Sequence, residues 1–79
     1  MPDYAVRLTR RPDGLTIASF PDVPEAVAYG RDDDEALEEA SAALEAAFRR
    51  RILGGQDIPE PRADGPLTIH QEVMAAALA

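Results

Sequence analysis

Two prolines interrupt the apolar stretch of residues 17–30 and exclude a helix there. Pro21 and Pro24 each fix their own φ, lack a backbone N–H donor and push the preceding residue towards extended conformations. The flanking residues 17–20 and 26–29 are apolar and partly β-branched or aromatic, which is typical of strands in a packed sheet. The sequence therefore predicts short strands on both sides of a rigid turn.

The N-terminal part of the chain predicts a hairpin that leads into this turn. Residues 4–10 alternate strictly, with Tyr4, Val6 and Leu8 on one face and Ala5, Arg7 and Thr9 on the other, which indicates a half-buried strand. The sequence of residues 11–14, Arg-Pro-Asp-Gly, has turn chemistry, because Asp-Gly tolerates positive φ. A second strand over 15–20 and a third over 26–29 then complete an antiparallel meander.

A long amphipathic helix follows the third strand. Asp32 is placed as its N-cap, and Glu35 three residues later completes the spacing of a capping box. Apolar side chains recur at intervals of three and four residues, at Leu37, Ala40, Leu44, Ala47, Phe48 and Ile52. This stripe predicts a helix over residues 33–53 that packs on one face of the sheet.

Beyond the helix, the sequence predicts one more strand. Residues 67–73 alternate between apolar and polar side chains and indicate a fourth strand, whereas the tail 74–79 favours a helix but is too short to hold one alone. The expected fold is α+β, in the order of three antiparallel strands, one long helix and a fourth strand, as a single domain over residues 1–79. Because the strand cores carry no acidic residue, any likeness to ribonuclease H would be a degenerate version without nuclease chemistry.

Several of these segments together carry a resemblance to a known family. They are Tyr4-x-Val6, Asp13-Gly14, Phe20-Pro21-Asp22-Val23-Pro24-Glu25, Gly30 followed by Glu35-Ala36-Leu37, and Ile58-Pro59-x-Pro61. From about Tyr4 to Pro61 the chain resembles the HicB family of antitoxins. The resemblance implies a small HicA-type toxin as partner, an RNA-cleaving protein that uses a histidine. It also implies that many members carry a C-terminal DNA-binding segment that represses their own operon.

The charge balance favours a protein partner. Fifteen acidic residues against eight basic ones give a formal net charge of −7, which repels nucleic acid and membrane phosphates and attracts a basic protein. The sequence has no cysteine and a single histidine, His70, so we expect neither a metal site nor a cofactor. It also has no apolar run of membrane-spanning length and no signal-peptide pattern, so a cytoplasmic protein without membrane contact is expected.

Each candidate site has a structural alternative. The acidic run of residues 32–35 is explained by a capped helix start better than by a metal ion. His70 has no predicted nucleophile or orienting acid beside it, so it is interpreted as a surface residue and not as a general base. The arginines of residues 49–51 suit the C-terminal end of the helix dipole better than phosphate binding. The turn of residues 20–25 is either a rigid corner or a contact surface, and both readings stay open.

The favoured hypothesis is an antitoxin that covers the RNA-binding surface of a basic toxin, with no catalytic residue of its own. The alternatives are a transcriptional autoregulator in a longer form and an orphan oligomeric protein-binding module. A homodimer or larger assembly is expected through residues 67–73 and 74–79, because a small domain leaves sheet edges uncovered. The predicted toxin-binding residues are Phe20, Pro21, Asp22, Pro24, Glu25, Asp32, Asp33 and Asp34.

Overall fold

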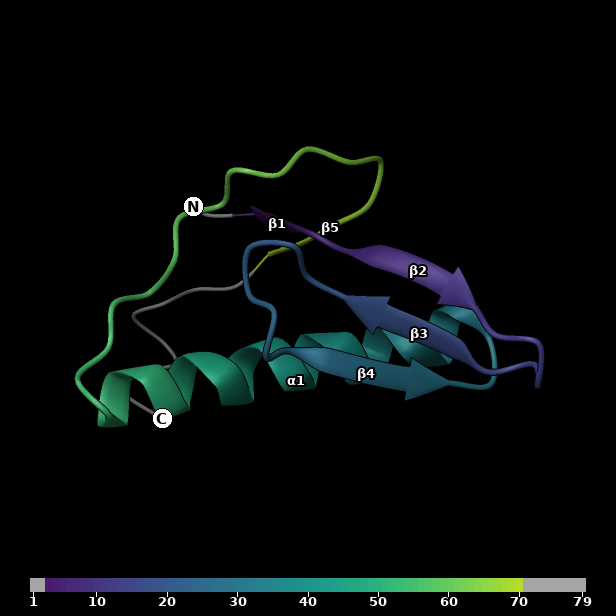
Figure 1. The fold of residues 1–79 in the computed structure, drawn as a ribbon, viewed down its shortest axis with the longest axis horizontal. Helices are drawn as coiled ribbons and strands as arrows, with labels where there is room; N and C mark the ends of the chain where they lie inside the picture. The colour runs from purple at the N-terminus through teal and green to yellow at the C-terminus, as the bar shows by residue number, and fades with distance from the viewer. Residues whose placement is uncertain (1–2, 71–79) are drawn as a thin grey trace.

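The computed structural model describes residues 3–70, which form an α+β fold with a long helix along one face of antiparallel strands (Figure 1). The elements in chain order are β1 (Asp3–Ala5), β2 (Arg7–Arg10), β3 (Thr16–Ser19), β4 (Val27–Gly30), α1 (Asp33–Leu53) and β5 (Thr68–His70). The strands form a three-stranded sheet in the order β2-β3-β4 and a two-stranded sheet of β1 and β5. Both sheets are antiparallel throughout.

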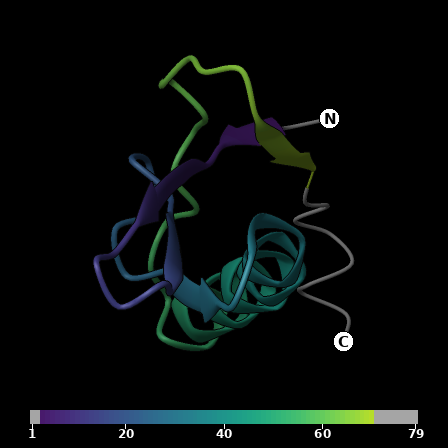
Figure 2. The same cartoon turned by 90° about the vertical axis from the view of Figure 1, so that its right-hand side faces the viewer.

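The prediction of one continuous strand over residues 4–10 was wrong, because the chain changes its pairing partner at Val6. β1 pairs with β5, and β2 pairs with β3. Val6 itself belongs to neither strand, although its N–H donates to the carbonyl oxygen of Leu67 at 3.1 Å. Figure 2 shows β1 and β5 side by side. A segment that serves two sheets must bend between them, and the bend falls at this residue.

The alternation predicted for the first strand also fails at Ala5. Ala5 was expected on the face opposite Tyr4 and Val6, yet all three side chains are buried. The chain after α1 covers Ala5 in part, because Gly65 lies close to it. A methyl group built on Gly65 would meet the Cβ of Ala5 at 3.8 Å. A segment covered on both sides buries successive residues and loses the period of two.

The three-stranded sheet presents its small residues to the helix. Leu8, Ala18 and Ala28 lie opposite one another on neighbouring strands, and the two alanines are buried. Tyr29, in contrast, points to the opposite face and is 53% exposed. The alternation along β4 therefore follows the expected pattern, with one face against α1 and the other face towards solvent.

The helix has the predicted bounds, Asp33–Leu53. Its buried residues are Ala36, Ala40, Leu44, Ala47 and Phe48. The predicted stripe is thus confirmed at its centre, while Leu37 and Ile52 lie at its rim, only partly buried. Phe48 also meets the ring of Tyr4 edge-on, with ring centroids 5.2 Å apart, which joins α1 to β1.

The predicted strand over residues 67–73 is present in part. β5 begins at Thr68, and its residues up to His70 pair with β1 in the register Asp3 with His70 and Ala5 with Thr68. Residues 71–79, with the predicted helical tail, lie outside the described residues. The ribonuclease H-like topology and the single-domain assignment of residues 1–79 stay predictions.

Candidate partner-binding site

The turn between β3 and β4 has a buried side and an exposed side. Phe20, Val23 and Ala26 are at most 1% exposed, whereas Pro21 and Pro24 lie at the surface. Two successive backbone bonds hold the turn, from the Val23 N–H to the Phe20 carbonyl and from the Ala26 N–H to the Val23 carbonyl. The Phe20 side chain belongs to the core, so it fixes the turn and is not available to a partner.

Asp22 was predicted to offer its carboxylate to a partner, but the structure engages that carboxylate within the chain. One oxygen, Oδ2, accepts hydrogen bonds from the backbone N–H groups of Arg62 and Ala63, both at 2.9 Å. The acidic residue of the turn thereby holds the segment that follows the helix. Hydrogen bonds to an ionised acceptor are among the stronger ones in proteins, so this contact is structural.

Glu25 is also engaged within the chain, by Arg51 near the end of α1. The guanidinium Nη2 donates to Oε1 of Glu25 at 3.0 Å, and Nε donates to the second carboxylate oxygen. This bidentate pair holds the pKa of the Glu25 carboxyl below its ordinary value, chiefly through the hydrogen bond from Arg51. Arg51 further donates to the carbonyl oxygen of Asp57 at 3.1 Å, so one side chain ties the turn, the helix and the following segment together.

The Glu25–Arg51 pair should give the domain a measurable sensitivity to acid. A carboxyl whose pKa is lowered in the folded state stabilises the fold above its unfolded pKa and loses that contribution as the pH falls through the folded value. We expect Glu25→Gln to reduce the free energy of unfolding at about pH 7, and to reduce it less at an acid pH below the folded pKa of Glu25, where the wild-type carboxyl is protonated as well. Urea unfolding at both pH values checks this, and an equal deficit at the two would contradict it.

The acidic helix start has the predicted cap. Asp32 Oδ1 accepts from the backbone N–H of Glu35 at 2.8 Å. The return bond differs from the capping-box expectation, because the Glu35 carboxylate accepts from the N–H of Arg31 at 3.0 Å and not from that of Asp32. The same carboxylate also pairs with the Arg31 guanidinium. The structural interpretation of this acidic run is therefore supported.

The next two acidic residues differ in their contacts. Asp33 Oδ1 accepts from Arg10 Nη2 at 3.3 Å and from the hydroxyl of Thr16 at 3.4 Å, which connects α1 to β2 and β3. Asp34 is exposed. Of the three predicted aspartates here, Asp34 is the one whose carboxylate makes no hydrogen bond or ion pair with another described residue.

The N-cap bond predicts unequal effects of removing two neighbouring carboxylates. Asp32→Ala should lower the free energy of unfolding by ~1 kcal/mol, because it leaves the Glu35 N–H without its acceptor. Asp34→Ala removes the same charge from the same turn and no capping bond, so it serves as the matched control with a smaller loss. Thermal or urea unfolding of both variants measures the difference, and equal losses would show that charge near the helix terminus matters and the cap does not.

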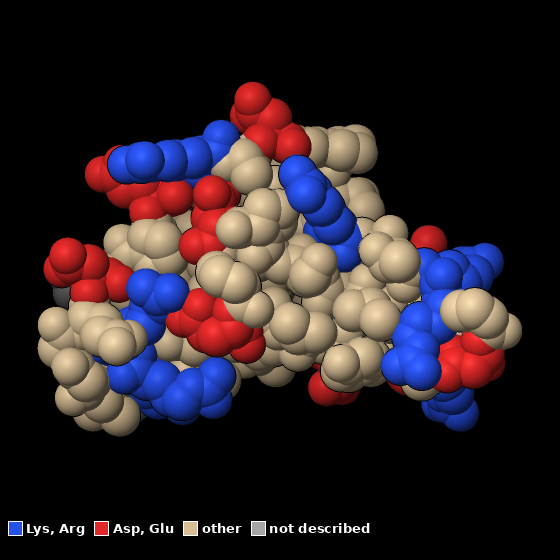
Figure 3. Space-filling view, in the orientation of Figure 1, with Lys and Arg blue, Asp and Glu red and all other residues tan. Residues whose placement is uncertain are grey.

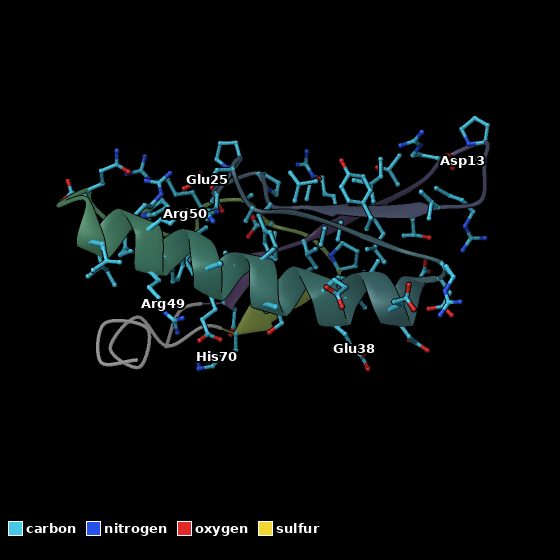
Figure 4. All side chains as sticks on the ribbon, turned by 90° about the horizontal axis from the view of Figure 1, so that it is seen from below. Asp13, Glu25, Glu38, Arg49, Arg50 and His70 are labelled. Carbon is cyan, nitrogen blue, oxygen red and sulfur yellow. The ribbon has the colours of Figure 1, made fainter. Side chains whose placement is uncertain are left out.

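The predicted site residues fall into two groups at opposite ends of β4. The turn precedes the strand and lies beside the C-terminal half of α1, whereas Asp32 to Asp34 follow it at the N-terminus of α1 (Figure 1). In Figure 4 the labelled Glu25 lies near Arg50, far from Asp13 in the β2–β3 hairpin. The structure therefore does not bring the two groups together, although both were predicted to bind the toxin.

Charge is distributed unevenly over the sheet side of the molecule. Figure 3 shows charged side chains of both signs gathered towards the two ends and along the top, with a largely uncharged centre. Strands β2, β3 and β4 carry Arg7 and Arg10 and no acidic residue. Within residues 3–70 most acidic side chains therefore lie in the helix and the connecting segments.

Two further titratable side chains, His70 and Arg49, have acidic partners close by. His70 Nδ1 lies 2.9 Å from Asp3 Oδ1, its cross-strand neighbour, and Arg49 pairs with Glu45 one helical turn away. Within residues 3–70 there is no group of three or more acidic, histidine or cysteine side chains arranged to hold a metal ion. The helix of the described residues, α1, does not have the hydrophobicity of a membrane-spanning segment.

Sequence reasoning missed the participation of Arg51 and the segment around Arg62 and Ala63. Arg51 was assigned only to the helix dipole, and no contact was predicted for the segment. Its hydrogen bonds to Asp22 cross 40 and 41 positions in the chain. The proline-containing motif Ile58-Pro59-x-Pro61 marked the segment as distinctive, but nothing in the spacing connects it to the turn.

The sequence of this domain is similar to known proteins over nearly its whole length. Residues 3–77 match a family described as HicB_like antitoxin of bacterial toxin-antitoxin system. Antitoxin HicB of Escherichia coli K12 is 37% identical over 75 residues, which cover 95% of this chain and 52% of that protein. Antitoxin HicB 1 of Photorhabdus laumondii is 36% identical over 77 residues, covering 90% of this chain and 50% of that protein.

The chain spans about half the length of these curated relatives. The match nonetheless includes all the described strands and the helix. It therefore includes the turn between β3 and β4, with Asp22, and the capped helix start. The chain belongs to the HicB-like antitoxin family of bacterial toxin–antitoxin systems.

Proposed function

We propose that this domain binds and neutralises a small basic HicA-type toxin by covering the surface with which that toxin binds and cleaves mRNA. The observation that carries the proposal is the family match over residues 3–77. The net charge of −7 supports it, because an acidic domain attracts a protein whose surface is built to bind phosphate. The inhibition is steric and electrostatic and needs no catalytic group on this chain.

The proposed contact lies on the turn between β3 and β4. Pro21 and Pro24 are exposed there and fix their own φ, so the turn loses little conformational entropy when a partner binds. Glu25 contributes negative charge while it is held by Arg51, and Asp22 holds the backbone of Arg62 and Ala63. Asp32, Asp33 and Asp34, at the other end of β4, contribute to the long-range attraction.

The proposal also covers the cellular location of the protein, its oligomeric state and its lack of DNA binding. The chain acts in the cytoplasm as a homodimer or larger assembly, and this domain alone does not bind duplex DNA. The charge supports the last point, because seven net negative charges oppose the approach of phosphates. Sedimentation at micromolar concentration and a promoter-binding assay at physiological salt test these two parts separately.

Co-expression with the adjacent reading frame tests the antitoxin function. If the neighbour encodes the toxin, cells that express it alone should stop growing, and cells that also express this domain should grow normally. A variant with a weakened core, Phe48→Ala, controls for the burden of expressing a second protein and should protect less than the wild type. Equal growth with and without the wild-type domain would remove the proposal in favour of a free-standing binding module.

A further inference from the structure

The segment of residues 57–63, here termed the clamped segment, is fixed to the domain at three points. Arg51 donates to the Asp57 carbonyl at 3.1 Å, and the Tyr4 hydroxyl donates to the Pro59 carbonyl at 2.5 Å. At its end the Arg62 and Ala63 N–H groups meet Asp22. The Ile58 side chain packs against the core between the first two points. The segment is therefore an ordered part of the surface, although it contains no helix or strand.

At the third of these points, Asp22 is the one residue of the turn that bonds to Arg62 and Ala63. Both N–H groups donate to the same oxygen, Oδ2, and the Asp22 side chain is only partly exposed. A partner protein that approaches this oxygen meets the backbone of Arg62 and Ala63. Any protein that docks on the turn beside Asp22 must accordingly touch the clamped segment as well.

The outward side of the clamped segment is suited to such a contact. Glu60, Pro61 and Arg62 are exposed there. Pro59 and Pro61 restrict the backbone, and the three anchor points remove most of the remaining freedom. A surface fixed before binding loses less entropy on association than a free loop of the same composition.

We infer that the clamped segment and the turn form one composite surface for a basic protein partner, and that Asp22 is a positioning residue within it. This inference rests on the proposed function and specifies its binding surface. Asp22 contributes to affinity by holding Arg62 and Ala63 in place, and its charge does not itself meet the partner. The alternative is that the Asp22 carboxylate pairs directly with a cation of the partner.

Two substitutions of Asp22 separate these possibilities because they remove the same charge. Asp22→Asn keeps the shape of the side chain and one carbonyl oxygen that can accept both hydrogen bonds, whereas Asp22→Ala keeps no acceptor. If Asp22 acts by positioning the clamped segment, the Asn variant should bind the partner with nearly wild-type affinity. The Ala variant should then bind it with an affinity on the order of tenfold lower. Direct charge pairing predicts that both variants bind equally weakly.

The binding experiment uses the full chain and the purified product of the adjacent toxin gene, with rate constants measured at several salt concentrations. If Asp22 is a positioning residue, the complex of the Asp22→Ala variant with the toxin should dissociate faster than the wild-type complex. Its association rate should keep the salt dependence of the wild type. Equal weakening in both variants, or a loss confined to the association rate, would overturn the inference. If the wild-type chain does not bind at all, the proposed function fails and this inference fails with it.

Amide hydrogen exchange on the free chain tests the clamp without a partner. In the wild type, the Arg62 and Ala63 amides should be protected, and Asp22→Ala should speed their exchange by about tenfold or more while the amides of α1 stay protected. Asp22→Asn should leave most of the protection in place. If both amides exchange without protection in the wild type, Asp22 does not hold Arg62 and Ala63. That result would contradict the inference independently of toxin binding.

Discussion

Replacing Gly30 with alanine is expected to destabilise the domain severely. A Cβ atom at this position would lie 2.3 Å from the backbone nitrogen of Ala36 and 2.8 Å from its Cα. These atoms belong to the first turn of α1, so neither a flexible side chain nor a rotamer change can relieve the clash. Overpacking of this kind costs roughly 1–3 kcal/mol and sometimes more, and we expect the upper end or beyond.

Gly65→Ala is the matched control for that substitution. It adds the same methyl group, but the nearest atom, the Cβ of Ala5, would lie at an ordinary contact distance of 3.8 Å. We expect a change within about 0.5 kcal/mol, as for other surface substitutions. Circular dichroism and urea unfolding measure both variants. A Gly30→Ala variant as stable as Gly65→Ala would show that β4 and α1 do not approach each other as closely as described.

Truncation of the helix core should have a comparably large effect. Leu44 and Phe48 are fully buried in the face of α1 that covers the sheet. Leu44→Ala should cost about 2–5 kcal/mol and Phe48→Ala about 3–5 kcal/mol, because each leaves a cavity that the neighbours fill only in part. A domain of this length has a total stability of roughly 4–12 kcal/mol, so either variant should be largely unfolded at elevated temperature.

Leu53→Ala controls for the loss of a large apolar side chain from the same helix. Leu53 is the last residue of α1 and is 83% exposed, so its truncation should change the unfolding free energy by less than about 0.5 kcal/mol. Thermal unfolding followed by circular dichroism compares the three variants. If Leu53→Ala were as damaging as Leu44→Ala, the helix would not pack through the face described.

The helix was predictable because its signals are local. Asp32 caps it, the apolar spacing defines one face, and the glycines after Leu53 end it, so the predicted bounds agree with the observed ones. The division of residues 4–10 was not predictable, because it depends on which distant strand pairs with each half. Alternation within a segment carries no information about its pairing partner.

The candidate site was predictable in composition and not in arrangement. The sequence marked the turn and the acidic helix start, but it could not show that Phe20 points inward or that Asp22 and Glu25 are held by Arg62, Ala63 and Arg51. Such contacts join positions far apart in the chain, and they depend on the path of a proline-containing segment that has no periodic pattern. Local propensity does not determine that path.

The most direct test of the antitoxin function is RNA cleavage by the purified toxin in the presence of this domain. The toxin alone should cleave a model mRNA, and cleavage should fall to background when the folded domain is added in stoichiometric amounts. Raising the salt concentration should slow formation of the inhibited complex, because opposite charges speed the encounter. Undiminished cleavage in the presence of a large excess of folded domain would contradict the account.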